Sequence, residues 1–155
     1  MDEPRCEKLL KNIFQTSNNR YTKSLEQNPS VRELRAKLQS PVENHYSGFN
    51  YLIEHKCALP AYEDEKCIVQ IECINGSFYH LTGRRIIHED SQQFTELLNY
   101  SEIQKVYIIR SQRERTHGEN PDSINVLTSK GNIKIKNLGI CWSVLETFLK
   151  AMAPK

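Results

Sequence analysis

The chain contains 155 residues, of which 38% are hydrophobic and 26% are charged, and its formal net charge at pH 7 is +2. Five phenylalanines, seven tyrosines and one tryptophan exclude an intrinsically disordered chain, because such chains are poor in aromatic residues that build a core. A net charge this close to zero excludes a dedicated, strongly basic nucleic-acid-binding domain, so a role of that kind requires a local basic patch.

The length predicts one domain over residues 1–155. No run approaches the roughly 18 apolar residues of a membrane-spanning helix. The N-terminal sequence MDEPRCEKLL lacks the basic-then-apolar order of a signal peptide. We therefore expect an intracellular protein without a membrane span, in the cytoplasm or the nucleus.

The first 60 residues predict helices. A helix is expected over residues 6–16, followed by a polar loop or weak helix over 18–27, a second helix from Ser30 to Ser40, and a third over about 48–57. The apolar face of the first helix either packs against a sheet or binds a partner. Its residues are Leu9, Leu10, Ile13 and Phe14.

From Lys66 onward the apolar residues alternate with a period of two, which predicts a strand over residues 67–73. Asn75-Gly76 predicts a two-residue type I′ hairpin turn. In the register of that turn Ile71 faces His80, so His80 is expected to point into the core. A reactive cysteine–histidine pair is then not expected, because apolar residues are the predicted neighbours of His80.

Two arginines follow the hairpin. Gly83 predicts a bulge or, with Thr82, a second tight turn into the next strand. Successive side chains of an extended segment alternate between faces, so Arg84 and Arg85 are expected to diverge. At most one of them is then a good candidate for binding.

The remaining elements are expected in the order helix, strand, loop, hairpin, helix. The helix covers residues 90–100 and the strand covers 105–111. A polar loop over 112–123 precedes a hairpin over 124–136 that turns at Lys130-Gly131. An amphipathic helix with a broad apolar face then follows Gly139.

These elements predict an α+β fold. A helical N-terminal part (1–60) packs on a largely antiparallel sheet of about five strands. One helix lies between the hairpin units, and a C-terminal amphipathic helix completes the part over residues 66–152.

The five cysteines are odd in number and form no CxxC pair. Three of them, Cys67, Cys73 and Cys141, lie in apolar segments, which predicts buried reduced thiols rather than disulfides or a zinc site. Nucleotide-binding, serine-hydrolase and metalloprotease motifs are all missing from the sequence, so we expect no cofactor.

Basic and aromatic residues suggest a binding surface instead of a catalytic one. Such residues bind a phosphate backbone or an acidic protein segment, and tyrosines add stacking surfaces. The alternative is a solvated face, because exposed strand positions often carry Lys and Arg. The candidate binding residues are Arg84, Arg85, Arg110, Arg113, Arg115, Lys134, Lys136, Tyr79 and Tyr107.

A series of strands that ends in one amphipathic helix carrying Trp142 resembles a pleckstrin-homology-like fold, over about residues 66–152. This resemblance implies seven strands, no helix between them, and a scaffold for lipid or peptide recognition. The segments ELRAKLQ and IVQIECING, followed by a Gly-Arg step, are similar to the N-terminal α+β region of an uncharacterised eukaryotic family that carries a PIN-type nuclease-like domain downstream.

We therefore expect a non-catalytic interaction or adaptor domain with a protein partner, as a subunit of a larger assembly. The second hypothesis is an accessory domain that binds RNA or DNA through a basic sheet edge. The third is a metal-dependent nuclease in which the acidic segment Glu63-Asp64-Glu65, Glu72 and Lys66 supply the site.

Overall fold

The computed structural model describes residues 3–27, 49–51, 64–109, 123–138 and 141–154, and in α1 and β1 the side chains of residues 18, 20–27 and 49–51 are left undescribed. The described elements, in chain order, are α1 (Glu3–Gln27), β1 (Phe49–Tyr51), β2 (Cys67–Glu72), β3 (Phe78–Thr82), β4 (Arg85–Asp90), β5 (Gln93–Asn99), the 3-10 helix η3 (Tyr100–Glu102), β6 (Ile103–Ile109), β7 (Ser123–Thr128), β8 (Gly131–Lys136) and α3 (Trp142–Met152).

The predicted α+β class with antiparallel pairing is confirmed. The single sheet of about five strands is wrong, because the strands form two sheets. One sheet has the order β2-β3-β4-β5, with the three-residue strand β1 added beside β2, and the other has the order β6-β7-β8. Every neighbouring pair is antiparallel and follows the order of the chain.

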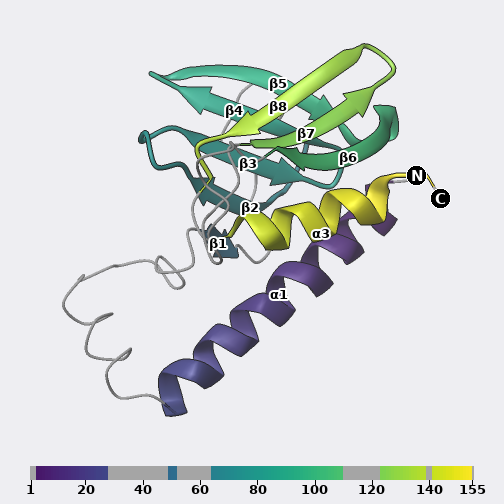
Figure 1. The fold of residues 1–155 in the computed structure, drawn as a ribbon. Coiled ribbons are helices and arrows are strands. Elements are labelled where there is room, and N and C mark those ends of the chain that lie inside the picture. The colour runs from purple at the N-terminus through teal and green to yellow at the C-terminus, as the bar shows by residue number, and fades with distance from the viewer. Residues whose placement is uncertain (1–2, 28–48, 52–63, 110–122, 139–140, 155) are drawn as a thin grey trace.

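The two sheets lie one over the other, and the helices lie along one side of them (Figure 1). Helices α1 and α3 are antiparallel, since the start of α1 meets the end of α3: Cys6 Sγ donates a hydrogen bond to Met152 Sδ at 3.6 Å. The buried side chains of both helices and of both sheets form one continuous hydrophobic cluster.

The apolar face of α1 packs inside the molecule. Cys6, Leu10 and Phe14 follow one another at intervals of four residues and are 0–2% exposed, while Leu9 and Ile13 are partly buried beside them. Full burial of a Leu or Phe side chain contributes about 1.5–3 kcal/mol. This face therefore anchors α1. The helix also continues through the polar residues 18–27, for which a loop or a weak helix was expected.

The first hairpin has a longer turn than the sequence predicts. Cys73 N–H donates to Ser77 O at 2.8 Å and Gly76 N–H to Cys73 O at 3.0 Å, so three residues form the loop, and only Gly76 takes a positive φ, of 87°. A turn closed by one left-handed glycine is the common three-residue hairpin connection. The predicted two-residue type I′ turn is therefore wrong.

The longer turn moves the strand register by one residue. Ile71 pairs with Tyr79, and Gln70 pairs with His80. A shift of one residue exchanges the two faces of a strand. Tyr79 and Leu81 consequently fill the core, and His80, predicted to be internal, lies half-buried on the outer face.

The helix predicted over residues 90–100 is wrong, since strands β4 and β5 pair there as a hairpin. Asp90 pairs with Gln93, and the two residues between them, Ser91 and Gln92, have φ values of 51° and 64°. This is the backbone of a type I′ turn, built without Asn or Gly. The helical spacing of Phe94 and Leu98 was misleading, because pairing with the buried strand β4 overrides local preference.

The segment predicted as the third helix begins with strand β1, whose residue Phe49 pairs with Ile71, so that part of the prediction is wrong. The helix predicted from Ser30 to Ser40 lies outside the described residues. The second hairpin and the C-terminal helix are confirmed as β7, β8 and α3. The hairpin turns at Ser129-Lys130, one residue before the predicted Lys130-Gly131, since Thr128 pairs with Gly131.

Tyr79 connects the two sheets. Its hydroxyl donates to the backbone oxygen of Lys136 at 2.9 Å and accepts from the Lys136 N–H at 3.2 Å, across the space between β3 and β8. Nearby, Ile74 N–H donates to Asn137 O at 2.9 Å. Burial raises the pKa of the Tyr79 hydroxyl to about 12, because the phenolate would lose its hydration.

We predict that Ser91→Asn with Gln92→Gly stabilises the protein by about 1–2 kcal/mol, because these residues adopt the left-handed backbone of the turn with less strain. Urea denaturation measures the gain. Ser129→Gly is the control: no positive φ occurs at Ser129, so the added chain entropy should lower stability there. A gain in both turns would contradict the explanation.

We also predict a loss of stability at alkaline pH. The Tyr79 pKa is about 12 in the folded protein and 10.0 in a model peptide. The contribution of the neutral phenol is therefore complete below pH 10 and falls as the pH rises from 10 to 12, by about 1.4 kcal/mol per unit. The free energy of unfolding, measured over this range, should fall less steeply in Tyr79→Phe. Equal slopes would contradict this assignment.

Candidate functional site

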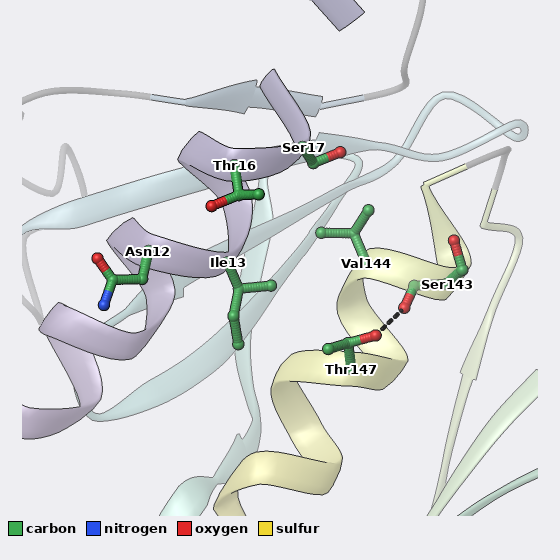
Figure 2. A pocket seen from close by; sticks show the side chains of 7 residues that line it. All are labelled: Asn12, Ile13, Thr16, Ser17, Ser143, Val144 and Thr147. Carbon is green, nitrogen blue, oxygen red and sulfur yellow. Dashed lines mark hydrogen bonds between the residues drawn. The ribbon is translucent and has the colours of Figure 1, made fainter. Parts of the chain in front are cut away.

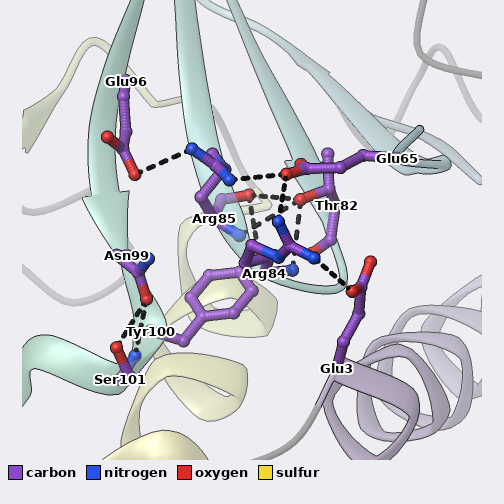
Figure 3. Close-up of polar contacts among 9 residues, drawn as sticks. All are labelled: Glu3, Glu65, Thr82, Arg84, Arg85, Glu96, Asn99, Tyr100 and Ser101. Carbon is purple, nitrogen blue, oxygen red and sulfur yellow. Dashed lines mark hydrogen bonds and ion pairs between the residues drawn. The ribbon is translucent and has the colours of Figure 1, made fainter. Parts of the chain in front are cut away.

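Arg84 and Arg85 converge on one buried carboxylate instead of diverging. The side chain of Glu65 is 1% exposed, and its Oε1 lies 2.7 Å from Arg85 Nη2 and 3.6 Å from Arg84 Nη1. Each arginine also has a second carboxylate, Glu3 at 2.9 Å for Arg84 and Glu96 at 3.3 Å for Arg85. We refer to these five residues as the arginine–glutamate cluster (Figure 3).

The turn between β3 and β4 explains this convergence. Thr82 Oγ1 accepts from the backbone N–H groups of Arg84 and Arg85, both at 3.1 Å, so Arg84 lies in a tight turn and not in an extended strand. The Tyr100 hydroxyl donates to Thr82 O at 2.9 Å and to Arg85 O at 3.1 Å, and these hydrogen bonds hold the same turn in place. Of the two predictions for Gly83, the tight turn is confirmed.

Gly83 allows this turn to lie against the start of α1. A Cβ atom at position 83 would collide with Glu7 Cγ and lie 3.1 Å from the backbone oxygen of Glu3. The turn and the helix therefore pack backbone against backbone, which brings Glu3 within reach of Arg84. A glycine is needed here for its size, as in other close backbone approaches.

The cluster has a structural role. Both guanidinium groups already have carboxylate partners, and contact with Glu3 raises the pKa of Arg84. A phosphate would have to displace Glu3, Glu65 or Glu96 before it could bind. The structure thus assigns these two predicted binding residues to holding α1, β4 and β5 together.

Tyr79 is also removed from the predicted binding set. Its side chain is 4% exposed, so its ring cannot stack on an external base, and its hydroxyl is used between the sheets. Arg110, Arg113 and Arg115 lie outside the described residues. Three candidates remain on the described surface: Tyr107, Lys134 and Lys136.

These three residues share the outer face of the β6–β7–β8 sheet. Tyr107 pairs with Asn125, and Asn125 pairs with Lys134, so Tyr107, Asn125 and Lys134 form one row across the sheet. Lys136 lies in the next row, paired with Ser123. The rows on either side complete a surface that we call the lysine–tyrosine face. Its nine positions are Lys105, Leu127, Asn132, Tyr107, Asn125, Lys134, Ile109, Ser123 and Lys136.

The lysine–tyrosine face combines positive charge with exposed apolar area. Its three lysines are exposed, and none of its nine positions is acidic. Tyr107, Ile109 and Leu127 are 37–40% exposed, which is high for large apolar side chains. Cationic and apolar groups together suit a partner that brings carboxylates or phosphates together with apolar groups.

Asn125 forms a polar centre under this face. It is completely buried, and its Nδ2 donates to Ser123 Oγ at 2.8 Å. Among the described residues, no donor reaches its Oδ1. Buried amide oxygens normally accept a hydrogen bond, and this atom has almost no solvent-accessible surface through which an external partner could supply one.

A second feature is a groove of about 380 Å³ between α1 and α3 (Figure 2). Ile13 and Val144 face each other across it, and hydroxyl and amide groups surround them. Thr147 Oγ1 donates to Ser143 O at 2.8 Å, so part of this polar lining is already hydrogen-bonded. The groove is uncharged. The lining residues are Asn12, Ile13, Thr16, Ser17, Ser143, Val144 and Thr147.

The carboxylates proposed for a nuclease site do not converge. Glu65 is buried against two arginines, whereas Glu72 is exposed on β2. In the parts of the chain that the structure describes, no three His, Cys, Asp or Glu side chains are placed to hold a metal ion. Glu63 lies outside those parts.

The fold and the face define an α+β protein with two antiparallel sheets and a mixed basic and apolar surface. No family model, curated protein or solved structure matches this chain. Within the described segments, neither helix has the length and apolar character needed to cross a membrane.

We predict that Glu65→Gln lowers the free energy of unfolding by about 3 kcal/mol, because it removes the charge that neutralises two neighbouring guanidinium groups at a buried position. Chemical denaturation measures the change. Glu96→Gln is the matched control. Glu96 is 40% exposed and also contacts Arg85, so its loss should cost less than about 1 kcal/mol. Equal losses would show that the burial of Glu65 is unimportant.

Proposed function

We propose that the protein is a non-catalytic intracellular interaction domain, an adaptor or subunit of a larger assembly, and that the lysine–tyrosine face binds an acidic, partly apolar segment of a protein partner. One observation supports this most directly. Three lysines without an acidic neighbour on that face lie beside three exposed apolar side chains, Tyr107, Ile109 and Leu127.

The chemistry of this surface favours a protein segment over a small substrate. Tyrosine contributes a large contact area with little loss of side-chain freedom, and aromatic residues are enriched where binding energy concentrates. Lysines around such a centre speed association with an acidic partner and reject a basic one.

Binding of single-stranded RNA or DNA is the second candidate, because Tyr107 and Lys134 lie in one row of the same sheet. One aromatic ring can stack on one base, and lysines can neutralise phosphates. The aliphatic side chains Ile109 and Leu127 are less suited to this role, since a nucleic acid chain brings few apolar groups to cover them.

We also propose that the scaffold is pleckstrin-homology-like, and the arrangement of the elements supports this. Strands β2–β5 and β6–β8 number seven, η3 is the only helical turn between them in the part of the chain described, and α3 follows as an amphipathic helix. The sequence had predicted a helix within the strand series, which a pleckstrin-homology-like fold lacks. The structure has strand β5 in that segment.

The decisive experiment compares two charge-reversal variants of the full chain. We predict that Lys134→Glu/Lys136→Glu reduces affinity for a synthetic peptide of alternating Glu and Leu at least tenfold, measured by fluorescence anisotropy. Tyr107→Ala should weaken binding as well. The control, Lys8→Glu/Lys150→Glu, makes the same change of charge at exposed positions of α1 and α3 and should bind as the wild type does.

Two outcomes would contradict the proposal. Equal loss in the control would show that the peptide responds only to net charge. Tighter binding of a mixed-sequence oligonucleotide than of the peptide, weakening with salt and lost in Lys134→Glu/Lys136→Glu, would favour the nucleic-acid function.

A further inference from the structure

Three side chains outside the proposed binding face form a chain of polar contacts across β2, β3 and β4. Cys67 Sγ lies 3.9 Å from His80 Nδ1, and His80 Nε2 lies 2.9 Å from Glu89 Oε1. A thiol, an imidazole and a carboxylate in this order are the parts of a base-activated cysteine nucleophile.

Two irregularities of the fold bring these residues together. The three-residue turn places His80 on the outer face of the sheet, and a bulge between Cys67 and Val69 changes the direction of the Cys67 side chain. A bulge commonly reorients a side chain in this way. The predicted register would have put His80 opposite Ile71, pointing into the core.

The contact with Glu89 determines which nitrogen of His80 can accept a proton. A carboxylate only accepts hydrogen bonds, so Nε2 carries the hydrogen and Nδ1 of the neutral ring presents its lone pair to the thiol. The thiol hydrogen has a second acceptor in the Val69 carbonyl oxygen, at 3.5 Å. Transfer of the proton to Nδ1 makes a thiolate beside an imidazolium, which Glu89 stabilises.

The surroundings of His80 are compatible with a positive ring. In the sheet, His80 pairs with Gln70 on β2 and with Ile87 on β4, and Ile87 pairs with Glu96 on β5. The rings of Phe78 and Phe94 lie 6.4 and 6.3 Å from the imidazole. The Glu89 carboxylate and two aromatic rings thus adjoin the histidine on this face, and the Arg85 guanidinium is held by Glu65 and Glu96.

Another cysteine of the same strand region provides an internal comparison. Cys73 and Cys67 are both 4% exposed. Burial raises the pKa of the Cys73 thiol, and its side-chain partner is Ser77, which is not a base at neutral pH. Burial likewise raises the pKa of Cys141 to about 12. Cys67 is the one cysteine for which the described structure shows a histidine partner.

We propose that Cys67 is a modification site: a thiol activated by His80 that a small peroxide oxidises to a sulfenic acid. The thiol proton passes to His80 Nδ1, and the sulfur lone pair attacks one peroxide oxygen. The O–O bond breaks, the departing oxygen takes the proton from His80 to give water or an alcohol, and sulfur is oxidised by two electrons. The 4% exposure restricts the site to small reagents.

The test exposes the folded protein to hydrogen peroxide, denatures it, alkylates the remaining thiols with iodoacetamide, and measures each cysteine by peptide mass spectrometry. We predict that the free thiol of Cys67 is lost at least tenfold faster than the free thiol of Cys73. His80→Gln should slow the reaction of Cys67 to the rate of Cys73, and Glu89→Gln should give an intermediate rate. His88→Gln, on the neighbouring strand, should leave the rate unchanged.

The comparison within the wild-type protein decides the proposal even where a variant is unstable. Equal rates for Cys67 and Cys73, at equal exposure, would overturn it. An unchanged Cys67 rate in His80→Gln, with an unchanged thermal midpoint, would overturn the role of the histidine.

Discussion

The structure depends most on the register between β2 and β3, which the three-residue turn closed by Gly76 sets. With this register Tyr79 points inward, where its hydroxyl binds the backbone of β8 and joins the two sheets. His80 is placed outward, beside Cys67 and Glu89. A shift of one residue would exchange these faces and would break both the connection between the sheets and the thiol–imidazole contact.

Charge is distributed in two different ways in this protein. In the arginine–glutamate cluster, carboxylates from α1, from the segment just before β2 and from β5 surround Arg84 and Arg85, so these cations hold elements together. On the lysine–tyrosine face, the lysines have no acidic neighbours within the face and stand beside exposed apolar side chains. A buried ion pair is costly to break, whereas an exposed lysine can exchange water for a partner. The second arrangement is therefore the one suited to binding.

Several elements could be predicted because their signals are local. Alternation from Ile124 to Ile135 predicted the second hairpin, and the broad apolar face after Cys141 predicted α3. The same reasoning failed over residues 90–100, where Phe94 and Leu98 have helical spacing but lie in a strand. Their hairpin turn uses Ser91 and Gln92 in left-handed conformations, for which neither residue is a recognisable signal. Tertiary pairing with β4 stabilises that turn against its local cost.

The candidate binding residues show the same limit of prediction from local sequence patterns. Lys134, Lys136 and Tyr107 could be identified from the sequence as exposed strand residues, but Lys105, Ile109 and Leu127 could not be added to them without knowing which strands are neighbours. Arg84 and Arg85 have an equally strong basic signal. Only the position of Glu65, in the segment that precedes β2, shows that their charge is already neutralised.

The sequence by itself determined the α+β class, the alternating strands β2, β7 and β8, the amphipathic helices α1 and α3 and the exposed lysines, because these depend on the period of apolar residues along a few neighbouring positions. Tertiary structure decided the division into two sheets, the register at Gly76, the neutralisation of two arginines and the meeting of Cys67 with His80. Each of these depends on contacts between residues far apart in the chain, or on a single inserted turn residue. A local pattern carries no information about such contacts.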